Sequence, residues 1–178
     1  LRKLLRQDIS LDPNAKADQY HYTPRIRYTE IFLAYAEAAN QAYGPQDKGG
    51  NGYSAYDVVK KLRHRAGIGR DNGDAYLESI KNDQAKMAEL IRNERRIELC
   101  FEGFRFWDLR RWLEAEKELN EPLTGWNVVA ADADGFYNNY QGPVVVWEKR
   151  GFLAPRDYFF PISSEVVQVS GVVQNPGW

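Results

Sequence analysis

Two carboxylates on one predicted helix, Glu30 and Glu37, have the type and spacing that could hydrolyse a glycosidic bond. Seven residues separate them, so they share one helix face, and Asn40 lies near them. At 1.5 Å of rise per residue their backbones stand roughly 10 Å apart, at or beyond the separation that inverting glycosidases use. The alternative is structural. Buried guanidinium groups need bidentate acceptors, and the sequence favours pairing of these acids with arginines from a later segment.

That segment, residues 91–112, alternates acids, arginines and large aromatics at helical spacing around one glycine, Gly103. A solvated helix does not need so many rings, and a buried helix does not normally carry so many ions. Burying ions in pairs is costly in desolvation and tolerates little substitution. We therefore predict a structural ion network between helices. Its expected members are Glu30, Glu37, Glu94, Arg95, Glu98, Glu102, Arg105 and Asp108.

A third group of side chains has the chemistry of a sugar site. Aromatic rings stack on the C–H faces of sugars, and Asn, Asp, Gln and Arg side chains bind the hydroxyl groups. Residues 120–155 lack a helical period, and a long aromatic stretch of this kind is typical of a functional loop. The predicted ligand-binding residues are Trp126, Asn127, Tyr137, Asn139, Tyr140 and Trp147. The alternative is that Trp126 and Trp147 only anchor the loop on the helices.

Other chemistries find little support in the residues. His21 and His64 have no Cys, Asp or Glu at metal-ligand spacing, so no metal site is predicted. Asp132–Gly135 begins like a calcium loop but lacks the downstream glutamate, and we interpret it as a turn. No cofactor is expected, since the chain has neither a phosphate-cradling glycine-rich motif nor Gly-x-Ser-x-Gly. The net charge of −1 and the acids between the arginines argue against nucleic acid.

Length and composition fit one domain with a core: 178 residues, 43% hydrophobic and 28% charged. The single cysteine, Cys100, excludes an internal disulfide and is expected to be a small buried thiol. No run approaches the ~20 apolar residues that span a bilayer, and no signal peptide is visible. Because the chain starts at Leu1 without a methionine, we expect a piece of a longer protein, with any targeting signal upstream.

Helices must position these side chains. The first is predicted from Thr23-Pro24, a cap followed by a proline at the first helical position, to Tyr43 before Gly44. Apolar residues on two of its faces predict burial on two sides. One face holds Tyr28, Ile31, Phe32, Tyr35, Ala38 and Ala42, and the other holds Ile26, Leu33 and Ala36.

A second helix is predicted from a capping box of Ser54 and Asp57 to Gly67, which makes an αα-hairpin with the first. A weak helix over 75–80 and a long helix from Asp83 to Gly103 follow, and a fourth helix covers 104–119. The long helix should turn Met87, Leu90, Ile91 and Ile97 inward. The expected organisation is one domain over 1–178, with a helical core at 23–119 and a loop-rich aromatic segment at 120–178. That segment should be irregular except for a β-like run, Val144–Trp147.

Four stretches stand in one order along the chain: Arg27–Asn40, Leu62–Gly67, Glu94–Arg111, and Phe160–Ile162 with Glu165 and Gln174–Gly177. Together they resemble the C-terminal region of the SusD/RagB family, surface glycan-binding lipoproteins of Bacteroidetes. Glu94–Arg111 is similar to the most specific signature of the family almost residue for residue. Lys60 departs from the pattern, since the family has Asn at this position.

The resemblance implies a mainly α fold of TPR-like helical hairpins, an αα superhelix, with a long irregular C-terminal segment and little β structure. It implies a parent protein whose N-terminal portion, with a lipid-attachment cysteine, is missing here. The implied function is non-enzymatic binding of oligosaccharides or other nutrients at the extracellular face of the outer membrane. A SusC-like TonB-dependent transporter would then receive the ligand. A helical-repeat scaffold for a protein partner and a glycoside hydrolase using Glu30 and Glu37 remain alternatives.

Overall fold

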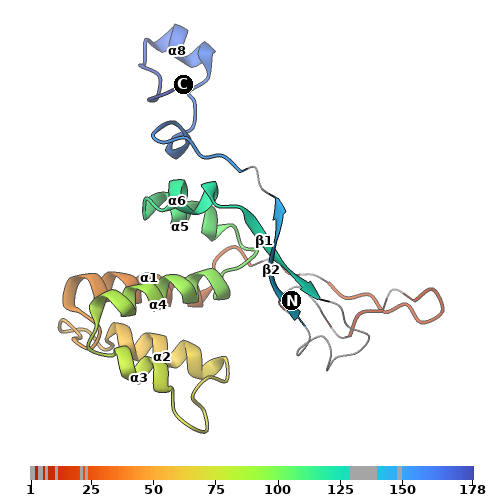
Figure 1. Cartoon of the computed structure of the whole chain (residues 1–178), viewed down its shortest axis with the longest axis vertical. Helices are drawn as coiled ribbons and strands as arrows, with labels where there is room; N and C mark the ends of the chain where they lie inside the picture. The colour runs from red at the N-terminus through yellow and green to blue at the C-terminus, as the bar shows by residue number, and fades with distance from the viewer. Residues whose placement is uncertain are drawn as a thin grey trace. The chain divides into compact units, whose positions relative to one another are not determined.

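The computed structural model describes residues 3, 6, 8–10, 12–20, 22, 24–128, 140–147 and 150–178, with the backbone alone for 126–128 and 140–142. Contacts divide the chain into two compact units, Leu1–Glu98 and Leu99–Trp178. Most of its ordered elements are helices (Figure 1), which confirms the mainly α fold class. The organisation as one domain stays a prediction.

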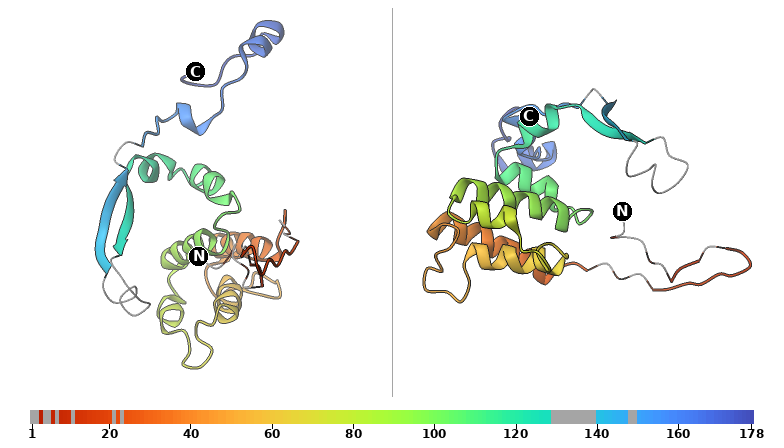
Figure 2. Two further views of the ribbon diagram at one scale, coloured as in Figure 1. Left: turned by 90° about the vertical axis from the view of Figure 1, so that its right-hand side faces the viewer. Right: turned by 60° about the horizontal axis from the view of Figure 1, so that its bottom comes forward.

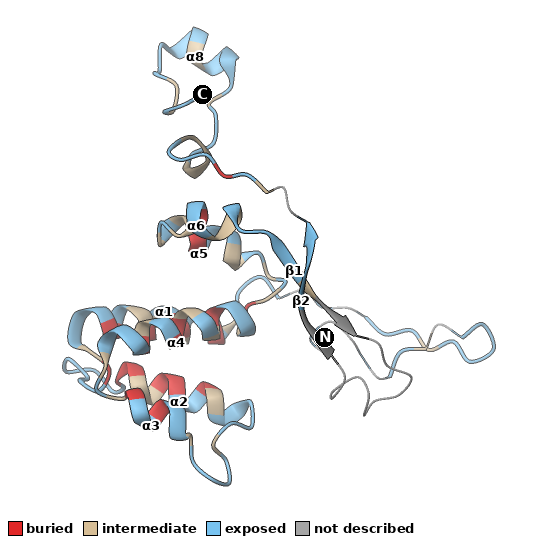
Figure 3. Ribbon diagram, in the orientation of Figure 1, coloured by how far each residue is buried: buried red, intermediate tan, exposed pale blue. Residues whose placement is uncertain are grey.

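The first unit contains α1 (Tyr28–Tyr43), α2 (Ala55–Arg65), α3 (Ala75–Ile80) and α4 (Gln84–Glu98). Helix α1 packs beside both α2 and α4, and the further views agree on this arrangement (Figure 2). Buried residues occur on all four helices (Figure 3). The buried apolar side chains are Leu33, Ala36, Ala39, Ala55, Val58, Val59, Leu62, Leu77, Ile80, Met87, Leu90 and Ile91.

Local signals fix both ends of α2. The Ser54 hydroxyl accepts from the Asp57 amide at 3.2 Å, and the Asp57 carboxylate accepts from the Ser54 amide at 3.0 Å, so the predicted capping box is confirmed. At the other end Gly67 has φ 95°. Its amide donates to the His64 carbonyl at 3.0 Å, and the Ile68 amide donates to the Arg63 carbonyl at 2.9 Å. These two bonds form a Schellman motif, which satisfies carbonyls that the helix end leaves open.

Helix α1 starts later than predicted. It begins at Tyr28, after an extended Arg27 with φ −116° and ψ 143°, whereas the prediction placed the start at Thr23-Pro24. Thr23 itself lies outside the described residues. The cap-and-proline signal is local, but Arg27 donates from its guanidinium to the Glu98 carbonyl at 2.8 Å, a tertiary contact that no local signal contains. The predicted end at Tyr43, before Gly44 with φ 83°, is confirmed.

Only one of the two apolar faces of α1 is buried within this unit. Leu33 and Ala36 are 0% exposed, whereas Tyr28 is 75% exposed and Ile31 is 53% exposed. The buried face also takes in Asn40, a polar residue that an apolar pattern does not include. A hydrophobic pattern cannot rank two apolar faces of one helix, because the neighbouring helices decide which face they cover.

Helix α4 ends at Glu98, earlier than the predicted end at Gly103. Phe101 (φ 63°) and Gly103 (φ 83°) are both left-handed, and two such residues within three positions stop a right-handed helix. Met87, Leu90 and Ile91 are buried as predicted, but Ile97 is 59% exposed, so its predicted inward position is wrong. Ile97 lies in the last turn of α4, where burial depends on neighbours beyond the helix itself.

The second unit contains α5 (Phe104–Arg111), α6 (Ala115–Asn120), β1 (Leu123–Val128), β2 (Tyr140–Trp147), a 3-10 helix (Arg156–Tyr158) and α8 (Ser164–Ser170). The single helix predicted over 104–119 is therefore two helices. Leu113 has φ 57°, its amide donates to Arg110, and the Glu114 amide donates to Leu109 at 2.9 Å. This Schellman motif ends α5. Leu109, Ala115 and Phe152 form a buried cluster next to the break.

Strands β1 and β2 form an antiparallel hairpin in the region predicted to be mostly irregular. The predicted β-like run Val144–Trp147 is part of β2 and is confirmed. Strand β1 escaped prediction because Gly125 and Asn127 are residue types that strands disfavour, and its partner strand stabilises it.

Among the described residues, no helix has the length and apolar character needed to cross a membrane.

The face assignment of α1 can be tested by a matched pair of substitutions. Leu33→Ala removes a fully buried side chain and should lower the free energy of unfolding by about 2–5 kcal/mol. Ile31→Ala, two residues away on the exposed face, should change it by no more than about 0.5 kcal/mol. Urea unfolding followed by circular dichroism measures both. Equal losses at the two positions would contradict burial of only one face.

Candidate functional site

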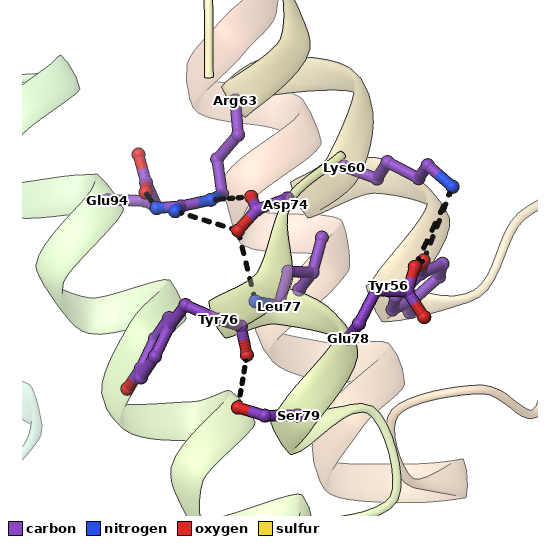
Figure 4. Close-up of polar contacts among 9 residues, drawn as sticks. All are labelled: Tyr56, Lys60, Arg63, Asp74, Tyr76, Leu77, Glu78, Ser79 and Glu94. Atoms are coloured by element: carbon purple, nitrogen blue, oxygen red, sulfur yellow. Dashed lines mark hydrogen bonds and ion pairs between the residues drawn. The ribbon is translucent and has the colours of Figure 1, made fainter. Parts of the chain in front are cut away.

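Arg63 on α2 joins carboxylates from two other segments of the first unit (Figure 4). Its Nε lies 2.5 Å from Asp74 Oδ2, and its Nη1 lies 2.6 Å from Glu94 Oε1 on α4. The three side chains are only 12%, 9% and 13% exposed, respectively. Asp74 is also the N-cap of α3, where its Oδ1 accepts from the Leu77 amide at 3.1 Å. One guanidinium therefore connects α2, the start of α3 and α4. We call Arg63, Asp74 and Glu94 the Arg63 clamp.

The Arg63 clamp shifts the ionisation of its members. The hydrogen bond from the Arg63 guanidinium holds the pKa of Asp74 below its ordinary value, and burial acts in the opposite direction. The same hydrogen bond raises the pKa of Arg63. Both shifts favour the charged forms, so the clamp is an ion pair at neutral pH. The geometry of the clamp suits a structural role, because Asp74 and Glu94 are both already paired with Arg63.

Glu98, the last residue of α4, is a second meeting point of charges. Its Oε1 lies 3.2 Å from Arg27 Nη1 and 2.6 Å from Arg65 Nη2. Its backbone carbonyl accepts from Arg27 at 2.8 Å and from Lys3 at 2.6 Å. Cations at the C-terminal end of a helix also interact favourably with the helix dipole. These contacts tie the approach to α1, the end of α2 and the end of α4 together.

The predicted ion-network residues lie in several separate places. Glu94 belongs to the Arg63 clamp, and Glu98 forms the second cluster. In the other unit, Arg105 pairs with Glu118 at 2.6 Å, and the buried Asp108 accepts from Arg111 at 2.9 Å. The remaining predicted members differ in burial and position: Arg95 is buried on α4, Glu102 is partly buried between α4 and α5, and Glu30 and Glu37 are partly buried on α1.

The arginine partners of the predicted ion-network acids differ from those expected. Within the residues that the structure describes, Glu30 forms no ion pair, although pairing with an arginine was expected. Arg63 was not among the predicted members, yet it is the partner of Glu94. A signal for it existed. Arg63 is the first arginine of the Leu62–Gly67 stretch, and an arginine on the apolar side of a helix, next to the buried Leu62, needs acceptors from elsewhere.

An open hollow at the start of α4 gives no support to acid–base hydrolysis there. Its lining is Gln41, Asn82, Asp83, Gln84, Ala85 and Ala88. This lining offers a single carboxylate, whereas glycoside hydrolysis uses two. Beside it, the side-chain amide of Asn40 donates to the backbone carbonyl of Gln84 at 3.0 Å, and the side-chain amide of Gln84 donates to the backbone carbonyl of Asn40 at 2.6 Å. The polar side chains here join α1 to α4.

The predicted sugar-binding residues gather on the β-hairpin as far as the structure describes them. The backbone places Trp126 and Asn127 on β1, opposite Pro143 and Gln141 of β2. Tyr140 begins β2 and Trp147 ends it, with a side chain that is 61% exposed. Tyr137 and Asn139 lie outside the described residues, as does the predicted turn Asp132–Gly135. The ligand-binding role of the two tryptophans stays a prediction.

Another group of exposed rings was not predicted as a surface. Phe106 and Trp107 on α5 meet edge to face with centroids 4.9 Å apart, and Phe160 stacks on Phe106 at 6.1 Å. These rings are 41%, 58% and 59% exposed. Arg110 covers one face of Phe106, with its guanidinium carbon 3.5 Å from the ring centroid.

In the part of the chain that the structure describes, no group of three His, Cys, Asp or Glu could hold a metal ion.

The elements and their buried ion pairs define a mainly α protein built from helical hairpins. The chain belongs to the SusD family, whose model matches residues 2–178. It is 29% identical to SusD-like protein P2 of Formosa agariphila over 169 residues, which are 93% of this chain and 27% of that protein. It is 32% identical to SusD-like protein P38 of the same organism over 101 residues, which are 56% of this chain and 18% of that protein.

A solved structure is similar as well. The crystal structure of a SusD-like protein from Bacteroides fragilis superposes with a TM-score of 0.62 at 30% identity, over 86% of this chain and 25% of that one. The chain therefore spans about a quarter of the length of the SusD-like protein P2 and of this solved chain. The family and fold expected from the four sequence motifs are confirmed.

Removing the guanidinium should expose the structural role of the Arg63 clamp. Arg63→Met leaves two mostly buried carboxylates without their cation and should destabilise the protein by about 3–5 kcal/mol. Arg65→Met is the matched control, since Arg65 is 52% exposed in its pair with Glu98 and should cost at most about 1 kcal/mol. Thermal and urea unfolding measure the difference. Similar small losses of unfolding free energy at both positions would show that the Arg63 clamp stabilises the protein no more than an exposed ion pair does.

The low pKa of Asp74 predicts a pH dependence. A carboxylate whose pKa is lowered in the folded state stabilises the fold above its unfolded value of about 3.9 and loses this contribution as the pH falls further. The difference in unfolding free energy between the wild type and Asp74→Asn should therefore be largest above about pH 5 and narrow towards pH 3. Urea titrations at several pH values measure it. A difference that stays constant across this range would contradict the shift.

Proposed function

We propose that this protein captures oligosaccharides or other nutrients at the outer face of a bacterial outer membrane and does not alter them chemically. The family match over residues 2–178 is the observation that carries the proposal. SusD-like proteins are generally binding proteins rather than enzymes, and both relatives in Formosa agariphila are named SusD-like proteins. Delivery of the ligand to a SusC-like TonB-dependent transporter and anchoring through a lipid belong to the same proposal.

The β-hairpin is the proposed ligand site on this chain. Trp147 supports it, because an indole that is 61% exposed offers a face on which a sugar ring can stack. Trp126, Asn127 and Tyr140 share the hairpin by backbone position, which adds hydrogen-bonding and stacking groups within two strands. Tyr137 and Asn139 remain part of the proposed set by sequence alone.

A scaffold that binds another polypeptide is a second candidate. The observation in its favour is the exposed side of α1, where Tyr28 and Ile31 are 75% and 53% exposed. Apolar residues gathered on one exposed helix face are typical of protein–protein contacts. Under this alternative the protein would bind a transporter or another partner tightly and show no response to sugars.

The proposed ligand site can be tested with one substitution and a neighbouring control. Trp147→Ala should weaken the binding of a responding oligosaccharide about threefold to tenfold, because one aromatic stacking contact is lost. Val146→Ala, at the adjacent and equally exposed position, should leave the affinity unchanged. Isothermal titration calorimetry across a panel of oligosaccharides measures both variants.

Two other outcomes would redirect the assignment. Tight binding to a transporter without a heat signal from any glycan would contradict the proposal and favour the scaffold. The glycoside-hydrolase alternative would be supported if the protein released new reducing ends from a glycan. Glu30→Gln or Glu37→Gln should then abolish this release in a folded protein. Reducing-end assays on the same oligosaccharide panel decide this point.

A further inference from the structure

Lys61 on α2 lies between aromatic rings rather than beside a carboxylate. Its Nζ is 5.3 Å from the ring centroid of Phe32 on α1 and 5.6 Å from that of Tyr53. Tyr28 extends the row along α1, edge to face with Phe32 at 4.7 Å. Within the described residues Lys61 forms no ion pair, whereas its neighbour Lys60 lies 3.9 Å from Glu78. We call Tyr28, Phe32, Tyr53 and Lys61 the Lys61 row.

The surrounding contacts fix the backbone at Tyr53 in this row. The Tyr35 hydroxyl on α1 donates to the Tyr53 carbonyl at 2.6 Å. The next residue, Ser54, is 2% exposed and holds the capping box that starts α2. The backbone at Tyr53 is thus held on both sides, yet the residue is 51% exposed, and Tyr28 is 75% exposed. A residue whose backbone is fixed before a ligand arrives loses less conformational entropy on binding.

The chemistry of the row selects its ligand. The exposed rings suit the C–H faces of sugar rings, and an ammonium group without a carboxylate partner suits an anionic substituent. A protein interface is less consistent with this pattern, since lysine is depleted at the core of interfaces where aromatics are enriched. Nucleic acid would require several cations along a phosphate backbone, and this row contains one.

We propose that the Lys61 row is a subsite for an acidic oligosaccharide, in which sugar rings stack on Tyr28 and Tyr53 and the ammonium of Lys61 binds a carboxylate or sulfate. The inference rests on the proposed capture of oligosaccharides and narrows the class of ligand. It uses the first unit of the chain and no residue of the β-hairpin. A carboxylate and a sulfate present the same charge to Lys61, so either group on the sugar meets this requirement.

The test compares charged and neutral sugars of equal length. Titration calorimetry with oligogalacturonate, the matched neutral galactose oligomer and a sulfated galactose oligomer should show binding that depends on the charged group and weakens with salt. Lys61→Met keeps the length of the side chain and should weaken the binding of the acidic oligomer about tenfold. Lys61→Arg should retain most of the affinity, because it retains the charge.

Lys60→Met is the control on the adjacent position, where the ammonium is paired with Glu78, and it should leave the affinity for acidic sugars unchanged. Because Lys61 is exposed, the unfolding midpoints of its variants should equal that of the wild type. Acidic binding that survives Lys61→Met, or binding of neutral oligomers alone, would overturn this inference and leave the proposed function standing. Failure to bind any sugar would overturn both this inference and the proposed capture of oligosaccharides.

Discussion

The ion pairs of Arg63 with Asp74 and Glu94 are the constraint on which the first unit depends. They connect α2, the N-cap of α3 and α4, and the buried Leu62 and Leu77 lie near Arg63 and Asp74 along the chain. A buried ion pair adds little net free energy compared with apolar packing of the same volume, because desolvation opposes the attraction. We infer that its value here is specificity. A register shift of α2 against α4 would strand charges that the present arrangement satisfies.

The fixed helices give the surface its chemistry. The mostly buried Arg63 pairs with Asp74 and Glu94, and Glu98 pairs with Arg27 and Arg65 at the end of α4. On the outer side, the same arrangement of α1 against α2 brings Lys61 of one helix next to Phe32 of the other. Among the described residues Lys61 forms no ion pair, and it lies beside the rings of Phe32 and Tyr53. A structural network within the unit and a binding surface on its outside can follow from one packing arrangement.

The sequence predicted the features whose partners lie nearby. The Ser54–Asp57 box, the end of α1 at Gly44 and the weak helix α3 all depend on groups within a few residues. It predicted less well where partners are distant. Strand β1 has unfavourable residues and exists through β2, and Glu94 meets Arg63 from 31 residues away. For the candidate site, sequence supplied residue types, and the structure placed four of the six on one hairpin by backbone position.

The sequence alone determined the family and the mainly α fold, because motifs and hydrophobic periods are properties of short stretches. Only the tertiary structure decided which face of α1 is buried, since Leu33 and Tyr28 belong to equally apolar patterns and neighbouring helices cover only one of them. It also decided that the helix predicted over 104–119 breaks at Leu113, and that Lys61 lies beside the rings of Phe32 on α1 and Tyr53 in the loop before α2. These outcomes depend on contacts between distant residues, which no local pattern encodes.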